Sequence, residues 1–344
     1  MSDSTTVAGI DAERVTAWFA EHVPDARPPF EFRLIAGGHS NLTYSVTDTT
    51  GARWVLRRPP LGQVLATAHD MEREHRIISA LAPTDVPVAP AVGLCTDPDV
   101  NGAPFYVMGF VDGLVLRSAA EAEQLSLDQR RRAGESLVDV MARIHAVDVD
   151  AVGLGDLGRK EDYLKRQLKR WYGQWEKSKT RELPAIDEVH DHLVAHTPEQ
   201  QGATIVHGDY RLDNCMVSRD GDVVAVLDWE ICTLGDPLAD LGLLMVYWTD
   251  PDDPNPNALA SATALDGFPR RAEVADRYAS LSPRDLSALP TYTAFGYWKL
   301  ACIVEGVYAR YLGGAMGQRD PESFAPFKTQ VESYADTAKR LLEI

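Results

Sequence analysis

The chain has 344 residues, of which 45% are hydrophobic and 25% are charged, an ordinary composition for a globular protein. Its 51 acidic and 34 basic residues give a net charge of −17, and a field of that sign argues against non-specific binding to nucleic acid. No apolar run approaches the roughly 18 residues that a membrane-spanning helix needs.

The N-terminal segment lacks a positively charged region followed by an apolar stretch, so we expect no secretory signal. Four cysteines lie far apart without a CxxC pair, which argues against a disulfide framework and a cysteine-built zinc site. We therefore expect free thiols in a cytoplasmic protein.

The first 112 residues predict a small lobe built on a sheet. Asp11 can cap a short helix, and from about Phe30 the apolar residues alternate as in strands. Strands joined by turns are expected within 30–46, 53–60 and 105–113, and a helix within 68–81.

From residue 113 the pattern becomes helical. Apolar stripes predict helices within 125–147, 160–182 and 236–248, and the second of these is the only locally basic segment of the chain. We therefore expect an α+β fold with two parts, an N-terminal lobe (1–112) with an antiparallel sheet and a larger helical lobe (113–344).

One motif is a poor fit to its usual function. The sequence "GLGDLG" (153–158) matches G-x-G-x-x-G, but a predicted helix precedes it, whereas a dinucleotide site needs a strand there and a βαβ unit around it. We interpret it as a turn between helices.

The segment 205–230, "IVHGDYRLDNCMVSRDGDVVAVLDWE", crowds carboxylates between short apolar runs. Carboxylates are costly to bury, so this arrangement favours a functional site. Asp209 can accept a proton, while Asn214 and Asp228 can share a magnesium ion, which prefers oxygen ligands and takes only one or two carboxylates. These residues are the components that phosphoryl transfer requires.

The motifs "HGDYRLDN" (207–214) and "VLDWE" (226–230) resemble the catalytic and metal-binding motifs of the aminoglycoside phosphotransferase family, which has a protein-kinase-like fold. Within this family, the motif sequences are most similar to those of the branch related to the phosphotransferase domain fused to some acyl-CoA dehydrogenases. The resemblance runs from about Phe32 to Gly313 and includes "GGHSNLTY", "WVLRRPP" and "WKLACIVEGVYARY". It implies a bilobal protein, with the nucleotide in the N-terminal lobe and the catalytic loop and acceptor site in the helical lobe.

The resemblance also implies roles for single residues. Asp209 would orient or deprotonate the acceptor hydroxyl, and Asn214 and Asp228 would hold Mg²⁺ on the β- and γ-phosphates of ATP. His207 would pack beneath the catalytic loop, and Asp240 would brace that loop through backbone hydrogen bonds. The sequence does not distinguish ATP from GTP as donor.

The same resemblance implies a nucleotide site in the N-terminal lobe. Small residues would let backbone N–H groups approach the phosphates, and an apolar residue would close the back of the adenine pocket. The residues implied are Gly37, Gly38 and Ser40 over the phosphates, with Met108 behind the adenine and the backbone of Gly109 and Val111 along its edge.

One departure from the kinase pattern concerns the phosphate-binding cation. A lysine is expected on the third strand, paired with a glutamate on the next helix. This chain has Arg57 at that place and Arg58 beside it, with Glu74 as the aligned partner and Glu72 as the alternative. Arginine stays charged and binds phosphate bidentately, so the role can be kept with altered geometry.

The acceptor is less determined by the sequence. The net charge would suit a cationic aminoglycoside, whereas Lys165, Arg166, Lys169 and Arg170 precede the catalytic segment and could face an anionic substrate. We favour a hydroxylated metabolite such as a hydroxyacyl-CoA or hydroxy acid. An antibiotic resistance kinase and an inactive nucleotide-binding scaffold are the alternatives. The expected partner is thus a small molecule, with neither nucleic acid nor membrane involved and the oligomeric state open.

Overall fold

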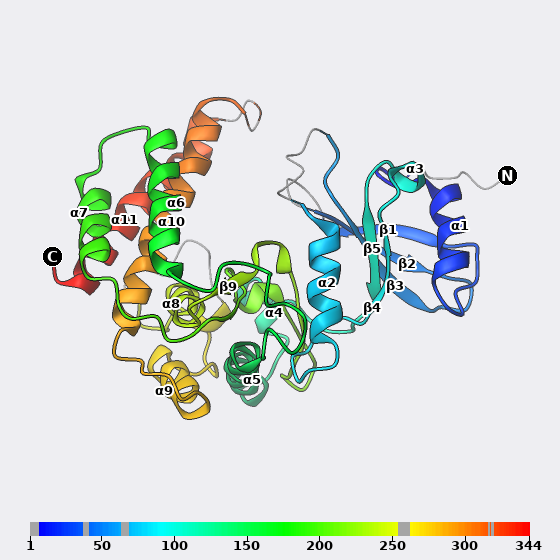
Figure 1. Ribbon diagram of the computed structural model, residues 1–344, viewed down its shortest axis with the longest axis horizontal. Coiled ribbons are helices and arrows are strands. Elements are labelled where there is room, and N and C mark those ends of the chain that lie inside the picture. The colour runs from blue at the N-terminus through cyan, green and yellow to red at the C-terminus, as the bar shows by residue number, and fades with distance from the viewer. Residues whose placement is uncertain (1–6, 37–40, 63–68, 254–261, 316, 318–319) are drawn as a thin grey trace. The chain divides into compact units, whose positions relative to one another are not determined.

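The computed structural model describes residues 7–36, 41–62, 69–253, 262–315, 317 and 320–344. The chain divides into two compact units, whose residues can be followed in Figure 1 by the colour of the ribbon. Unit 1 comprises residues 1–113 together with 224–230, and unit 2 comprises residues 114–223 and 231–344. A short segment inside the sequence of unit 2 therefore belongs to unit 1.

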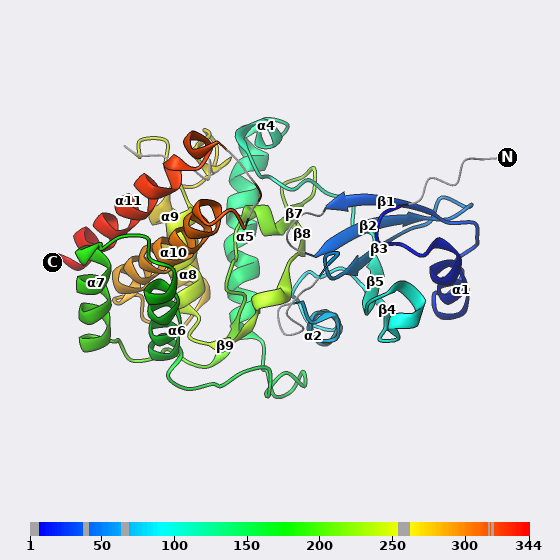
Figure 2. The ribbon, with the colours of Figure 1, turned by 90° about the horizontal axis from the view of Figure 1, so that it is seen from above.

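Unit 1 is built on a five-stranded sheet in the order β1-β2-β3-β5-β4, whose paired strands are all antiparallel. Figure 2 shows this sheet with α1 and α2 as separate helices beside it. The elements are α1 (Ala12–His22), β1 (Glu31–Ala36), β2 (Leu42–Thr47), β3 (Arg53–Arg58), α2 (Met71–Leu81), β4 (Ala91–Cys95), α3 (Pro98–Asn101) and β5 (Phe105–Gly109).

An aromatic core joins α1 to the sheet. Phe19 on α1 is fully buried and lies edge-on to Phe32 of β1 and Trp54 of β3. Trp18 lies 4.9 Å, between ring centroids, from Phe105 of β5. Such pairs bury large apolar areas in a fixed geometry, so they hold the strands in register.

Helix α2 lies within the range 68–81, where a helix is expected. Asp70 is its N-cap and accepts a hydrogen bond from the backbone N–H of Arg73 at 2.9 Å. Its apolar face buries Met71, Ile77 and Ile78. The same face carries Glu74, whose residue surface is only 2% exposed.

Unit 2 is mainly helical. Its elements are α4 (Ala119–Ala122), α5 (Leu127–Ala146), α6 (Tyr163–Ser178), α7 (Pro184–Ala195), β6 (Thr204–Val206), η1 (Leu212–Asn214), β7 (Cys215–Val217), β9 (Thr233–Gly235), α8 (Leu238–Tyr247), η3 (Ala262–Ala264), α9 (Arg271–Leu281), α10 (Leu289–Leu312), η4 (Pro321–Ser323) and α11 (Ala325–Leu342). The elements β8 (Val223–Val226) and η2 (Trp229–Ile231) fall almost entirely within the segment 224–230 of unit 1.

Helix α10 is the centre of unit 2. It contacts α11, α8, α6 and α7 (Figure 1), and most of its residues from Tyr292 to Gly306 are buried. Helix α8 is likewise buried from Leu238 to Val246. A helix that is apolar all round belongs in a core, so these two helices form the interior against which the functional loop is built.

These elements confirm the expected α+β class with an antiparallel N-terminal sheet and a helical remainder. Residues 153–158 form turns after α5, as expected for the "GLGDLG" segment. Among the described residues, no helix is long and apolar enough to cross a membrane.

Candidate active site

The loop 207–209 follows the buried strand β6, which pairs with β9. Gly208 has a φ of 86°, a left-handed conformation that glycine adopts without strain. A side chain there would also press on Ile231, since an added Cβ would lie 3.1 Å from its Cδ1. The glycine therefore permits the sharp turn that leads into Asp209.

Asp240, in the first turn of α8, braces this loop. Its carboxylate accepts the backbone N–H of His207 at 2.6 Å and that of Gly208 at 2.8 Å. Burial disfavours the charged carboxylate, but hydrogen bonding and the charge of His145, with help from the Gly208 N–H, outweigh burial and lower the pKa of Asp240. Asp240 is thus a buried carboxylate that is compensated by His145 and by the loop it holds.

The side chain of Asp209 is held at both oxygens. The hydroxyl of Tyr247 donates to Oδ1 at 2.8 Å, and Nδ2 of Asn214 donates to Oδ2 at 2.9 Å. The Nε of Arg211 lies 3.7 Å from the same Oδ2. The carboxylate is nevertheless 29% exposed, so one side of it faces outward.

Asn214 uses its amide nitrogen within the loop. Its Nδ2 also donates to the backbone oxygen of Asp209 at 2.8 Å. Since both contacts engage the nitrogen, the carbonyl oxygen is the atom left to coordinate a cation. This orientation fits the metal-ligand role that the sequence predicts for Asn214.

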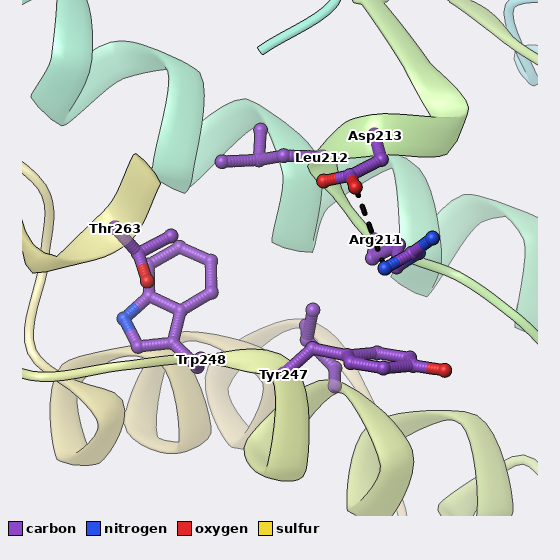
Figure 3. Close-up of a pocket in the computed structure, with 7 residues that line it drawn as sticks. Arg211, Leu212, Asp213, Tyr247, Trp248 and Thr263 are labelled. Carbon is purple, nitrogen blue, oxygen red and sulfur yellow. Dashed lines mark ion pairs between the residues drawn. The ribbon is translucent and has the colours of Figure 1, made fainter. Parts of the chain in front are cut away.

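Beside Asp209 lies a small pocket, drawn in Figure 3. The guanidinium of Arg211 lies 4.9 Å from the ring centroid of Tyr247, and its Nη1 lies 3.4 Å from the carboxylate of Asp213. Burial raises the pKa of Asp213 in spite of the nearby Arg211. The lining residues are Arg211, Leu212, Asp213, Leu244, Tyr247, Trp248 and Thr263.

In unit 1, Arg57 of β3 points at carboxylates. Its Nε lies 2.9 Å from Oε2 of Glu74, and its Nη2 donates to Oδ1 of Asp228 at 2.5 Å. The hydroxyl of Tyr106 also donates to Glu74, at 3.0 Å. Burial disfavours the charge on Arg57, but the charges of Glu74 and Asp228 outweigh it and raise its pKa. Burial raises the pKa of Glu74 even beside Arg57.

Arg58 and Glu72, the alternative pair, lie elsewhere. The Nη1 of Arg58 donates to the backbone oxygens of Gly9 and Asn101, at 2.5 and 2.8 Å. Glu72 is exposed on α2. Of the two arginines, Arg57 is therefore the one in contact with the glutamate of α2, and its role toward phosphate stays a prediction.

Asp228 has a left-handed backbone, with a φ of 64°. Strand β8 ends at Val226, whose N–H donates to Pro87 of unit 1 at 2.9 Å, and Asp228 follows two residues later. Non-glycine residues adopt this conformation rarely, and such strain gathers at functional positions. The carboxylate is 32% exposed, and one of its oxygens is bound by Arg57.

A polar network around Arg57 includes residues that the sequence reasoning did not select. Nδ2 of Asn41 donates to Glu74 at 2.8 Å and to Glu230 at 3.2 Å. His69 is hydrogen-bonded to Oδ1 of Asn41, at 2.7 Å from its Nδ1. Asn41 lies in the "GGHSNLTY" motif and Glu230 in the "VLDWE" motif. The two motifs therefore pointed to this network, although the sequence predicted roles only for other residues within them.

The expected adenine-side residues lie at the end of β5. Met108 and Gly109 are half-buried, as is Val111 beyond the strand. The N–H of Gly109 donates to Pro90 at 2.8 Å, so a nucleotide contact at this residue would fall to its carbonyl group. Gly37, Gly38 and Ser40 lie outside the described residues.

The structure describes Asp209 and Asn214 within unit 2 and Asp228 within unit 1. No cluster of three or more histidine, cysteine, aspartate or glutamate residues suited to a metal occurs in the part of the chain that is described. Magnesium commonly takes one or two protein ligands and completes its shell with water and phosphate. The donor atoms of Asn214 and Asp228 fit that chemistry.

A basic stripe follows one side of α6, which we define as Arg166, Lys169, Arg170 and Lys177. With Gly173 and Gln174, these residues line a shallow depression. Lys169, Arg170 and Lys177 are exposed, and within the described residues none of them forms an ion pair with a carboxylate. Like charges spaced along one helix side are unfavourable, so the stripe concentrates positive charge on one side of α6 in a chain of net charge −17.

Comparison with known proteins gives consistent matches. A family model described as the APH phosphotransferase enzyme family matches residues 31–274. Acyl-CoA dehydrogenase family member 10 of Mus musculus is 35% identical over 291 residues, a region that is 83% of this chain and 27% of the mouse protein. The chain thus spans only about a quarter of that relative's length.

Solved structures share the fold. A Ralstonia eutropha protein, provisionally assigned as an aminoglycoside phosphotransferase, is 33% identical with a TM-score of 0.79, covering 96% of this chain and 98% of that one. The GDP complex of aminoglycoside 2'-phosphotransferase-IIIa has a TM-score of 0.63 at 15% identity, covering 95% of this chain and 99% of that one, which bears on the fold alone. These likenesses confirm the expected bilobal, protein-kinase-like α+β fold.

Proposed function

Because this chain belongs to the APH phosphotransferase enzyme family, we propose that it is a small-molecule kinase that uses ATP and Mg²⁺ to phosphorylate a hydroxyl group. The observation that carries the proposal is the setting of Asp209. Its carboxylate is oriented by Tyr247 and Asn214, on a loop that Asp240 clamps. Catalysis of phosphoryl transfer is largely positioning and charge stabilisation, which such a fixed loop provides.

In this proposal Asp209 accepts the proton of the acceptor hydroxyl as its oxygen bonds to the γ-phosphorus. The bond between that phosphorus and the β,γ-bridging oxygen breaks, and ADP leaves with the electron pair. A bound magnesium ion would supply positive charge to the phosphates, and Asn214 and Asp228 are the residues that would hold it. Arg57, kept charged by Glu74, would bind phosphate oxygens in the place of the usual lysine.

For the acceptor we propose an anionic hydroxylated metabolite, a hydroxyacyl-CoA or a hydroxy acid. Two observations support it. The basic stripe of α6 offers positive charge to phosphate or carboxylate groups, and the mouse relative is named as an acyl-CoA dehydrogenase family member. The net charge of −17 favours the second candidate, a cationic aminoglycoside.

Screening acceptor-dependent ADP release tests both candidates. Purified protein is supplied with MgATP and, in parallel, with 4-hydroxyacyl-CoAs, the free hydroxy acids and kanamycin. We expect turnover with the hydroxyacyl-CoA, and in the Asp209→Asn variant a kcat lower by about 10²- to 10⁴-fold, the usual contribution of a general base. Turnover with kanamycin alone would overturn the acceptor assignment, and undiminished turnover by Asp209→Asn would overturn the role of Asp209.

A further inference from the structure

Lys299 of α10 is an unusual residue in its setting. It stands in the buried run Trp298–Cys302 and is only 8% exposed. Burial lowers the pKa of its ammonium group, against the opposing charges of Asp209 and Asp240. Because an ammonium group is costly to bury, an apolar residue would serve the packing of α10 better.

The contacts of Lys299 lead to the catalytic loop. Its Nζ donates to the backbone oxygen of Gly208 at 3.1 Å. The same Nζ lies 5.7 Å from the ring centroid of Trp171 on α6, which gives the cation a second favourable neighbour. No carboxylate lies within ion-pair distance of Lys299 in the regions that the structure describes. The hydrogen bond to Gly208 is therefore the specific contact.

That hydrogen bond acts on one peptide plane. The oxygen of Gly208 and the N–H of Asp209 belong to the same planar peptide group. Lys299 holds the oxygen, and Nδ1 of His207 accepts the N–H at 3.3 Å. Two contacts at opposite sides of a plane fix its rotation, and the Cα of Asp209 lies at the end of that plane.

We propose that Lys299 is a positioning residue, which sets the direction of the Asp209 side chain by holding the Gly208–Asp209 peptide from α10. Asp240 holds the preceding N–H groups of the loop from α8, so the loop is fixed by a buried anion on its amides and a buried cation on its carbonyl. The catalytic consequence of this inference rests on the proposed function. The contact between Lys299 and the loop rests on geometry alone.

Three substitutions separate the contributions of Lys299. Lys299→Met keeps the length and apolar stem and removes both donor and charge. Lys299→Gln keeps a donor without the charge, and Lys299→Arg keeps both. The control is Glu305→Gln, a buried residue of the same helix whose carboxylate bonds Thr180 and Arg181, away from the catalytic loop.

Hydrogen–deuterium exchange on the ligand-free protein tests the contact itself. In Lys299→Met we expect at least tenfold faster exchange in the peptide covering 205–210, with α8 and the rest of α10 unchanged. The melting temperature should stay within about 3 °C of wild type or rise, because the variant removes a buried charge. Uniformly faster exchange across unit 2 with a lower melting temperature is the mark of a purely structural lysine and would overturn the proposal.

Steady-state kinetics with MgATP and a 4-hydroxyacyl-CoA test the consequence. We expect kcat of Lys299→Met to fall about 10²-fold, the scale of a displacement near 1 Å, with both KM values within about threefold. The Lys299→Gln and Lys299→Arg variants should each recover part of the lost kcat. Glu305→Gln should change the stability and leave kcat unaltered. A kcat for Lys299→Met within threefold of wild type would refute the role. If the exchange result holds while wild type transfers no phosphate, the proposed function fails and the contact stands.

Discussion

Arg57 forms ion pairs with both Glu74, whose Oε2 lies 2.9 Å from Nε, and Asp228, to whose Oδ1 its Nη2 donates at 2.5 Å. The candidate phosphate-binding cation and the candidate metal ligand of unit 1 therefore contact each other directly. Glu74 is almost fully buried, so its charge is compensated only as long as Arg57 remains beside it. This relationship makes the stability of unit 1 depend on a residue of the proposed nucleotide site.

Removing Arg57 alone should strongly destabilise the protein. Arg57→Met leaves Glu74 buried without its cation, a change that typically costs about 3–5 kcal/mol. The double variant Arg57→Met/Glu74→Met removes both charges and should regain most of that loss. Urea unfolding at pH 7, followed by circular dichroism, of wild type, Arg57→Met, Glu74→Met and the double variant gives the four free energies of the cycle.

A matched control lies on the same strand. Arg53 forms an ion pair with Asp112 at 2.7 Å, and both side chains are well exposed. Arg53→Met should therefore cost less than about 1 kcal/mol. Equal losses at Arg53 and Arg57 would contradict the account of a buried, coupled pair.

Asp228 should carry the magnesium dependence of nucleotide binding. We expect ATP with Mg²⁺ to raise the melting temperature more than ATP with a chelator, because ligands that bind only the native state stabilise it. In Asp228→Ala the extra shift due to Mg²⁺ should vanish, while the shift due to ATP alone persists. Asp112→Ala, which removes an exposed carboxylate of the same unit, serves as control. The same Mg²⁺-dependent shift in Asp228→Ala and wild type would show that the metal is held elsewhere.

The basic stripe of α6 should affect binding of an anionic acceptor rather than the chemical step. Lys169→Glu reverses one charge of the stripe, and we expect KM for a 4-hydroxyacyl-CoA to rise about tenfold with kcat within twofold. Lys165→Glu makes the same charge change on the same helix, at a residue that pairs with Asp162 outside the stripe. Similar KM values for the two variants would show that the stripe does not contribute to binding of the acceptor.

Stability should fall on mild acidification because of His145. This residue is fully buried between Tyr278 and Asp240, and burial lowers its pKa below 6.5. Below pH 6.5 the His145 imidazole binds a proton more readily in the unfolded chain than in the native state. The free energy of unfolding therefore falls as the pH drops, by at most about 1.4 kcal/mol per pH unit. Asp240, with its lowered pKa, would add its own loss only near and below pH 3.8.

Urea unfolding between pH 5 and 7.5 measures this slope. His145→Gln keeps a polar side chain that does not titrate, and the slope between pH 5 and 6.5 should flatten in that variant. His196→Gln, which changes an exposed histidine of unit 2, should leave the slope as in wild type. A slope that survives in His145→Gln would assign the acid sensitivity to another group.

The candidate site residues could be selected from the sequence because their spacing is local, and their roles stay predictions. Asp209, Asn214 and the arginine of β3 lie in short segments whose pattern carries their chemistry. Asp240 and Tyr247 are seven residues apart on α8, which places them on one helix face, so a helical projection anchored on Asp240 would also have selected Tyr247.

The contacts of Lys299 and Asn41 could not be predicted from local sequence patterns. Lys299 meets Gly208 across 91 positions of sequence, and Asn41 meets Glu230 across 189. A lysine within an apolar helix gives no sign of which carbonyl it will reach, because that is decided by how α10 packs. The backbone strain at Asp228 is also invisible in the sequence, since aspartate is common in ordinary turns.

The discontinuous make-up of unit 1 has a consequence for biosynthesis. Residues 224–230, including the backbone bond from Val226 to Pro87, reach this unit only after 114–223 have been translated. At the usual pace of about 5–20 residues per second, the nascent sheet waits several seconds for its last segment, with the Glu74 carboxylate and Arg57 present but Asp228 still missing. Ribosome-bound chains should therefore acquire full protease resistance in this region late, when Glu230 has emerged, rather than when Gly113 has.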